Sequence, residues 1–187
     1  MTTLRKEAVH YIEDQQVATP YYQVTPQEAR AMRTVTPWQS PHKPTLAVMQ
    51  DQLITMRDGA QITLRLYIPT HDQPLPVIVY YHGGGWVYGN LESADAGCQL
   101  LADQAQAIVV SVDYRLAPEF PFPTPLQDAY DSLLWVHDHI EAFGGDTARL
   151  TVAGDSAGGN LATVVAYLAV TSGGPSLQAQ ALIYPVT

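Results

Sequence analysis

Residues 151–160 read Thr-Val-Ala-Gly-Asp-Ser-Ala-Gly-Gly-Asn, a short apolar run that leads through a glycine-rich corner into a helical run. The central five residues fit the pattern Gly-x-Ser-x-Gly, in which the serine occupies a strained turn between a strand and a helix. Gly154 and Gly158 lack a Cβ atom, so the backbone can fold sharply there. The pattern predicts that Ser156 is a nucleophile above the N-terminus of the next helix, where partial positive charge favours a developing anion. The alternative interpretation is a turn that only packs.

A second motif, His-Gly-Gly-Gly-Trp, occupies residues 82–86. It follows the continuous apolar run 77–81, which predicts a central strand buried on both faces. Three consecutive glycines cost backbone entropy, and an ordinary loop rarely needs that many. Backbone amides that must approach a reacting oxygen closely do need them, because side chains would block the approach. The run therefore predicts an oxyanion hole.

The rest of residues 52–187 alternates between strand and helix patterns. Asp58-Gly59 predicts a tight turn, and the strict apolar alternation over residues 62–68 predicts a hairpin strand with one buried face. The expected strands are 53–56, 62–68, 77–81, 107–112, 149–153 and 179–184, and the expected helices are 92–105, 126–143 and 160–171. This order is typical of an α/β fold, a parallel sheet with helices on both faces.

The first 45 residues differ from the rest in carrying five prolines and several aromatic side chains. Thr25-Pro26-Gln27-Glu28 has the signature of a helix start, with Thr25 as the cap, and predicts a helix through Met32. A second helix is expected over residues 4–12. We therefore divide the chain into an N-terminal segment, 1–45, and a larger domain, 46–187.

Composition narrows the location and partners. Nine Lys and Arg against eighteen Asp and Glu give a net charge of −9, and with no basic run this argues against nucleic acid and anionic membranes as partners. Cys98 is the one cysteine, which rules out an internal disulfide and suits a reducing cytoplasm. No signal-peptide core and no apolar run of membrane-spanning length is present. We expect a cytoplasmic protein without a membrane partner.

Three separate signatures together resemble one family. Residues 82–86, residues 113–119 (Asp-Tyr-Arg-Leu-Ala-Pro-Glu) and residues 154–160 match the bacterial hormone-sensitive-lipase-like esterases in order and spacing. The resemblance runs from about Met49 to Thr187, with a looser likeness of the first 45 residues to that family's helical cap. It implies an α/β-hydrolase core, a mostly parallel sheet with helices on both faces, that lacks its last strands. The sequence itself contains no metal-ligand cluster, no P-loop and no dinucleotide-binding motif, so we expect no metal and no cofactor.

The resemblance also implies roles for individual residues. Ser156 is the nucleophile, and the 113–119 segment is a scaffold turn that stabilises the site without doing chemistry. The other implied roles are an oxyanion hole from the amides of Gly84, Gly85 and Ala157, supporting positions at His82, Gly83 and Asp155, and a substrate pocket with Trp86 and Tyr88.

The sequence departs from the family after Ser156. Residues 157–187 contain no Asp, Glu or His, whereas the family places its catalytic acid and histidine base further along the chain after its nucleophile. His137 and His139 lie two residues apart on the predicted helix and therefore face different ways. We predict that neither is the base, and the same holds for the upstream histidines His10, His42 and His71. We therefore expect a C-terminally truncated esterase that is nearly inactive alone.

Two further expectations follow. A sheet that ends at residues 179–184 would present an unpaired edge, which would take either the rest of a longer protein or a second copy as a homodimer. The leading function is hydrolysis of small to medium acyl esters. The alternative is a non-catalytic protein that binds a small ligand on the same scaffold. A peptidase or epoxide hydrolase is weaker, since epoxide hydrolases of this fold carry Asp where Ser156 stands.

Overall fold

The computed structural model describes residues 5–6, 9, 19–32 and 43–187 and divides the chain into two compact units, Met1–Thr34 and Val35–Thr187. In the first unit a 3₁₀ turn, η1 (Tyr21–Gln23), precedes helix α2 (Pro26–Met32). The Thr25 amide donates to Glu28 Oε2 at 2.7 Å and the Glu28 amide donates to Thr25 Oγ1 at 3.3 Å, which confirms the predicted helix start. The helix expected over residues 4–12 lies largely outside the described residues, and the boundary at 45 stays a prediction.

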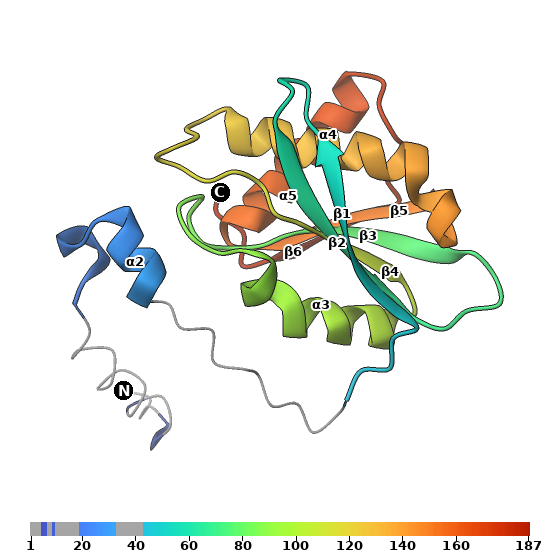
Figure 1. The fold of residues 1–187 in the computed structure, drawn as a ribbon, viewed down its shortest axis with the longest axis horizontal. Coiled ribbons are helices and arrows are strands. Elements are labelled where there is room, and N and C mark those ends of the chain that lie inside the picture. Colours follow the sequence, from blue (N-terminus) through green and yellow to red (C-terminus); the bar gives the residue numbers. More distant parts are fainter. Residues whose placement is uncertain (1–4, 7–8, 10–18, 33–42) are drawn as a thin grey trace. The chain divides into compact units, whose positions relative to one another are not determined.

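Six strands form one mixed sheet in the order β1-β2-β4-β3-β5-β6 (Figure 1). The strands are β1 (Val48–Thr55), β2 (Gln61–Ile68), β3 (Leu75–Tyr81), β4 (Ile108–Val112), β5 (Gly145–Asp155) and β6 (Ala179–Ile183). The pairs β1–β2 and β2–β4 are antiparallel, whereas β4–β3, β3–β5 and β5–β6 are parallel. The predicted α/β fold with a mostly parallel sheet is confirmed.

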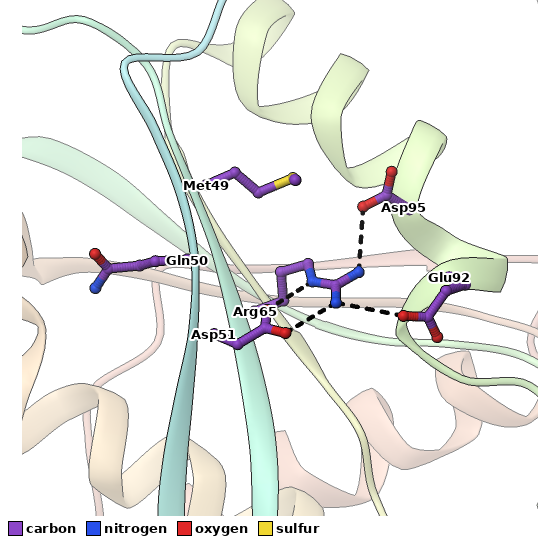
Figure 2. Close-up of a pocket in the computed structure, with 6 residues that line it drawn as sticks. All are labelled: Met49, Gln50, Asp51, Arg65, Glu92 and Asp95. Atoms are coloured by element: carbon purple, nitrogen blue, oxygen red, sulfur yellow. Dashed lines mark hydrogen bonds and ion pairs between the residues drawn. The ribbon is translucent and has the colours of Figure 1, made fainter.

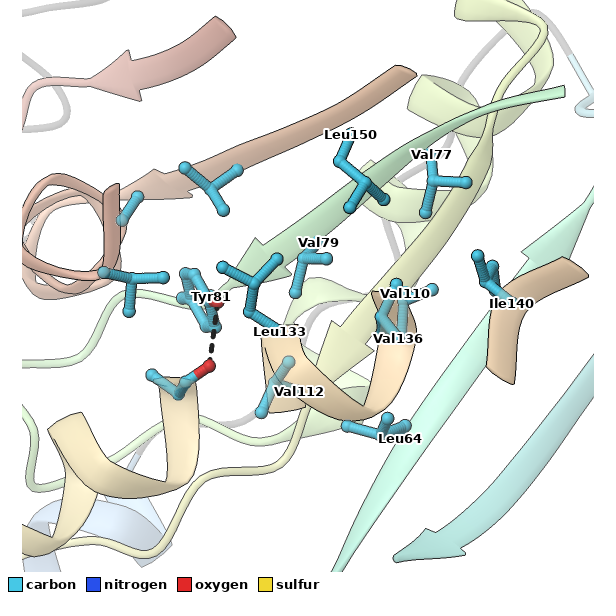
Figure 3. Packing of buried hydrophobic residues seen from close by; sticks show 14 of the residues in the cluster. Leu64, Val77, Val79, Tyr81, Val110, Val112, Leu133, Val136, Ile140 and Leu150 are labelled. Atoms are coloured by element: carbon cyan, nitrogen blue, oxygen red, sulfur yellow. Dashed lines mark hydrogen bonds between the residues drawn. The ribbon is translucent and has the colours of Figure 1, made fainter. Parts of the chain in front are cut away.

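Helices cover both faces of this sheet. Helix α3 (Leu91–Ala105) lies on one face, while α4 (Thr124–His139) and α5 (Ala157–Thr171) lie on the other (Figure 1). A short 3₁₀ turn, η2 (Ile140–Phe143), follows α4, so the helix expected through residue 143 ends four residues earlier. The larger core lies under α4 and α5, and among its fully buried members are Val77, Val79, Tyr81, Val110, Leu133, Val136 and Leu150 (Figure 3).

The hairpin forms as expected, with one correction. The Met56 amide donates to Ala60 O at 2.8 Å around the turn, and the alternating apolar residues of β2 are buried. The expectation that only one face of β2 is buried is wrong, because Tyr67 on the opposite face is also fully buried. It packs with Cys98 and Ala102 of α3, and its hydroxyl donates to Asp95 at 2.9 Å.

The register of the three central strands places the motifs at one edge. Tyr81, the last residue of β3, pairs with Val112 at the end of β4 and with Gly154 near the end of β5. Because these strands are parallel, the segments that follow them start at the same level. The glycine run, the 113–119 turn and the Ser156 corner therefore share the carboxyl edge of the sheet, where α/β folds bind ligands.

The other strand next to the serine corner is β6, which lies at the edge of the sheet and whose five residues are exposed. It pairs in parallel with β5, from Thr151↔Ala179 to Asp155↔Ile183.

Over the part of the chain that the structure describes, no helix is both long enough and apolar enough to cross a membrane.

Candidate active site

Ser156 occupies a sharp corner between β5 and α5. Its backbone has φ 52° and ψ −117°, a conformation that is strained for a residue with a side chain. A Cβ on Gly154 or on Gly158 would overlap the Tyr81 carbonyl oxygen, and on Gly158 it would also press on the His82 carbonyl. Only glycine fits at both positions, so the corner packs directly on the end of β3. The geometry is that of the predicted nucleophile turn.

The backbone of the corner is fastened on its other side by the segment that follows β6. The Ser156 amide donates to Ile183 O at 2.9 Å, and the Ser156 carbonyl accepts from the Val186 amide at 3.1 Å. Asn160, in the first turn of α5, donates its Nδ2 to Val186 O at 3.0 Å. These bonds offset the strain at Ser156 and hold its side chain, which is only partly buried, at the sheet edge.

The glycine run forms a tight loop beside this corner. Gly84 and Gly85 have φ of 131° and 58°, so both lie where side chains are disfavoured. The Gly84 carbonyl accepts from the Val87 and Tyr88 amides, each at 3.0 Å, which turns that carbonyl back into the loop. Gly85 is exposed, and a Cβ there would meet open space. This freedom means that only the backbone conformation requires glycine at position 85.

Asp155 joins the two segments. Its Oδ1 accepts from the Gly83 amide at 2.8 Å and from the Tyr80 hydroxyl at 2.9 Å. Burial, together with the Asp155 carboxylate, raises the pKa of Tyr80 above its ordinary value, so that hydroxyl stays a donor. Tyr80 is a supporting residue that the sequence did not reveal, because it looks like any residue of a buried strand.

His82 lies under the loop and is only 2% exposed. Its Nδ1 lies 2.8 Å from Gly83 O, and its ring stacks on Tyr114 with 4.3 Å between the ring centroids. Burial lowers the pKa of His82 below 6.5, which favours the neutral ring. Nε2 has no hydrogen-bond partner among the described residues. These contacts fit the expected structural role and offer Ser156 no base.

The 113–119 turn follows β4 at the same edge. Tyr114 is buried, and its hydroxyl donates to His82 O at 2.6 Å. Arg115 binds the fully buried Asp128 of α4 through Nη2 at 2.6 Å and Nε at 2.9 Å, and it reaches Asp58 of the hairpin at 2.8 Å. The turn therefore contacts the loop, the helix and the hairpin together.

A cavity of about 520 Å³ opens beside the glycine loop. Its lining is almost wholly apolar and consists of Gly85, Trp86, Ala117, Phe122, Pro125, Leu126, Asn160, Leu161 and Val164. Trp86, which the sequence analysis assigned to a substrate pocket, lines this cavity. Its backbone φ of 60° is positive, like those of Gly84 and Gly85 before it. Tyr88 is not part of this lining, so its pocket role stays a prediction. The composition suits an uncharged, apolar group.

The remaining predicted residues are placed as follows. Ala157 is the first residue of α5 and is fully buried, with its amide at a helix N-terminus. The described histidines other than His82 make contacts elsewhere: His71 Nδ1 with Gln73 O, and His139 Nδ1 with Trp135 O at 2.8 Å. His137 Nδ1 lies 3.0 Å from its neighbour Asp138. That none of these histidines is the base stays a prediction, and His10 and His42 lie outside the described residues.

A second cavity, of about 480 Å³, lies away from Ser156 between the hairpin and α3 (Figure 2). Arg65 occupies its centre and contacts Asp51 at 2.6 Å, Glu92 at 3.3 Å and Asp95 at 3.5 Å. The arginine thus links the two hairpin strands to the helix.

Among the described residues, no group of three or more His, Cys, Asp and Glu side chains could hold a metal ion.

Comparison with known proteins agrees with this geometry. A family profile described as the alpha/beta hydrolase fold matches residues 78–187. Carboxylesterase NlhH of Mycobacterium tuberculosis is 52% identical over 133 residues, 70% of this chain and 41% of its own. Ethyl acetate hydrolase of Pseudomonas putida is 44% identical over 143 residues, 74% of this chain and 45% of its own.

Solved structures give the same answer. The thermostable carboxylesterase EstE1, cloned from a metagenomic library, superposes with a TM-score of 0.82 at 43% identity, over 89% of this chain and 57% of that one. The chain thus spans about half the length of the relatives it matches. The profile match, the sheet order and the serine corner lead to one conclusion: the chain belongs to the α/β-hydrolase family, in its hormone-sensitive-lipase-like group.

Proposed function

We propose that this chain carries the nucleophile and the oxyanion hole of a carboxylester hydrolase. The observation that supports this most directly is the contact between the two motifs: the Ser156 corner rests on the carbonyls of Tyr81 and His82, and Asp155 binds the Gly83 amide at 2.8 Å. A packing turn would need neither the strained serine nor a glycine loop beside it.

In the proposed reaction Ser156 Oγ attacks the ester carbonyl carbon and loses its proton to a base. The carbonyl oxygen becomes an oxyanion, which the amides of Gly84, Gly85 and Ala157 stabilise. The C–O bond to the alcohol then breaks, and the alcohol leaves with a proton. Water hydrolyses the resulting acyl-enzyme and restores the serine.

The base and the acid of this reaction come from outside the 187 residues. Residues 157–187 contain no Asp, Glu or His, and His82 is buried, which lowers its pKa. Members of such a triad act as a unit, and without them the oxyanion hole and binding leave about 10³-fold acceleration over water, against roughly 10⁶ more for the intact set. The chain alone is therefore expected to be nearly inactive.

The apolar cavity beside Gly85 supports small to medium acyl esters as substrates. Its volume of about 520 Å³ accommodates a short chain or a small ring, and its lining carries no ionisable side chain. One relative is named an ethyl acetate hydrolase, which agrees with small esters. The cavity would equally serve a protein that only binds such molecules, which is the second candidate function.

Labelling with a fluorophosphonate probe separates these functions. A longer protein that contains this chain, with the base and acid in place, should label at Ser156 and hydrolyse p-nitrophenyl butyrate, and Ser156→Ala should abolish both. The 187-residue chain should label slowly. Ester binding without labelling by the longer protein would favour the binding function, and fast turnover by the chain alone would contradict an external base.

Two finer expectations belong to the same proposal. The exposed β6 edge pairs with a further strand, either of a longer protein or of a second copy. Sedimentation of the chain over a range of concentrations tests whether a second copy pairs with this edge.

The single cysteine, Cys98, is buried, and burial raises its pKa to about 12. It therefore stays an unreactive thiol, as a cytoplasmic location allows.

A further inference from the structure

The turn of residues 113–119 touches the glycine loop at two places, one on each side of the three glycines. Before them, the Tyr114 hydroxyl donates to His82 O at 2.6 Å. After them, the Ala117 amide donates to Trp86 O at 2.8 Å. Both acceptors are backbone carbonyls, so the contacts depend on the path of the loop and not on its side chains.

These two bonds enclose the part of the loop that most needs holding. Residues 83–85 are all glycine, so each has two soft dihedral angles and no side chain to limit them. Gly84 and Gly85 also have positive φ, a conformation that glycine leaves easily. Asp155 holds only the first of the three amides, that of Gly83.

The turn is itself fixed between its two contacts. Arg115 lies between Tyr114 and Ala117 and binds Asp128 of α4 through two nitrogen atoms, and the Arg115 amide also donates to Asp128 at 3.0 Å. Asp128 is fully buried on a helix that packs against the sheet. The position of the turn is therefore set by the core and not by solvent.

We infer that Tyr114 and the Ala117 amide are the two attachment points that position the oxyanion hole, with Arg115 and Asp128 as their anchor. The inference rests on the proposed function for its catalytic part. Tyr114 touches no substrate in this account and is a positioning residue. It keeps the amides of Gly84 and Gly85 directed at the oxygen that becomes charged, which is the geometry that such sites must hold ready before reaction.

Hydrogen exchange tests the structural part on the 187-residue chain. Tyr114→Phe removes only the hydroxyl and leaves the ring that stacks on His82. We expect the bonded loop amides, Gly83, Val87 and Tyr88, to exchange about tenfold faster in this variant. The matched control is Tyr67→Phe, which removes another fully buried tyrosine hydroxyl, bonded to Asp95 on the far face of the sheet. That variant should leave loop exchange unchanged.

Kinetics test the catalytic part in a longer protein that hydrolyses p-nitrophenyl butyrate through Ser156. Tyr114→Phe should lower kcat by about tenfold while KM changes less than about twofold, because the oxyanion is bound only in the transition state. Tyr67→Phe should change neither kcat nor KM. Loss of stability would reduce the fraction of active enzyme, so titrating active serines with the fluorophosphonate in each variant separates that loss from a true change in kcat.

The exchange experiment tests whether Tyr114 holds the loop, and the kinetic experiment tests whether that contact positions the oxyanion hole. Unchanged loop exchange in Tyr114→Phe overturns the attachment, and equal kcat in Tyr114→Phe and wild type overturns the positioning role. If hydrolysis by the longer protein survives Ser156→Ala, the proposed function fails. The exchange experiment still decides whether Tyr114 holds the loop in that case.

Discussion

The Gly83 amide and the Asp155 carboxylate, which lie 72 positions apart in the chain, form a 2.8 Å hydrogen bond across the carboxyl edge of the sheet. A carboxylate that accepts from an amide makes a charge-assisted bond, which is stronger than a neutral one. The same oxygen accepts from Tyr80, so one side chain holds the glycine loop, the serine corner and strand β3 together.

Replacing Asp155 should therefore affect both stability and the site. Asp155→Ala removes two charge-assisted bonds, and we expect a loss of about 3 kcal/mol in the free energy of unfolding. Urea unfolding measures it. Asp146→Ala on the same strand is the control, since Asp146 lies at the opposite end of β5 and bonds Arg149 and the Ala148 amide. Similar losses in both variants would contradict a special role for Asp155.

The two glycines Gly158 and Gly97 predict opposite responses to alanine. A Cβ on Gly158 would overlap the Tyr81 carbonyl, so Gly158→Ala should lower the free energy of unfolding by about 3 kcal/mol through overpacking. Gly97 lies exposed within α3 with open space around a new Cβ, so Gly97→Ala should raise it by about 0.5–1 kcal/mol. Thermal unfolding of both variants checks the pair, and a shift of the same sign in both would refute the packing argument.

Removing Asp128 should be more costly than breaking an exposed ion pair. Asp128 is fully buried and the Arg115 side chain is 13% exposed, and Asp128→Ala leaves the guanidinium without its buried partner at a cost of about 3–5 kcal/mol. Arg57→Ala breaks the pair with Asp131, in which the arginine side chain is 48% exposed, and should cost less than about 1 kcal/mol. Chemical denaturation compares them. Equal costs would mean that Asp128 is not tied to Arg115 in solution.

Acid should destabilise the fold through His82. Burial lowers its pKa in the folded state below 6.5, so the unfolded chain binds the proton more readily. The stability that neutral His82 contributes is present above pH 6.5 and is lost as the pH falls through 6.5 towards the folded-state value. The slope for this group reaches at most about 1.4 kcal/mol per pH unit.

Urea midpoints measured at pH 7.5, 6.5 and 5.5 test this dependence. His82→Gln removes the titrating ring, so the variant should be less stable at pH 7.5 but should lose less stability between pH 6.5 and 5.5. Parallel pH curves for the variant and the wild type would rule out His82 as the source.

The sequence predicted those features that local backbone requirements encode. Gly154 and Gly158 around a serine can be recognised because the corner admits no side chain at either position. The glycine run and the order of strands and helices could likewise be predicted from the sequence, since each depends on neighbours along the chain.

Contacts between residues far apart in the sequence could not be predicted. Tyr80 looks like any residue of a buried strand, and Tyr114 stood out only as part of the scaffold turn, yet their hydroxyls bind Asp155 and His82 O, 75 and 32 positions away. The burial of Tyr67 was missed for the same reason, because α3 covers a face that the alternating pattern of β2 left polar. Which side chains meet is decided by strand order and register, and the hydrophobic pattern contains neither.

The pairing of β3 with β5 has a consequence for how such a site can vary. Tyr81 opposes Gly154, and the Ser156 corner and the glycine loop begin immediately beyond that pair. A shift of two residues in either strand would preserve which side chains face the core, but it would carry one group past the other by about 6.6 Å. Extra residues are accommodated at the opposite end of the pair, where the register shifts between Leu75 and Val77, whereas a length change between there and the Tyr81–Gly154 pair would separate the Ser156 corner from the glycine loop.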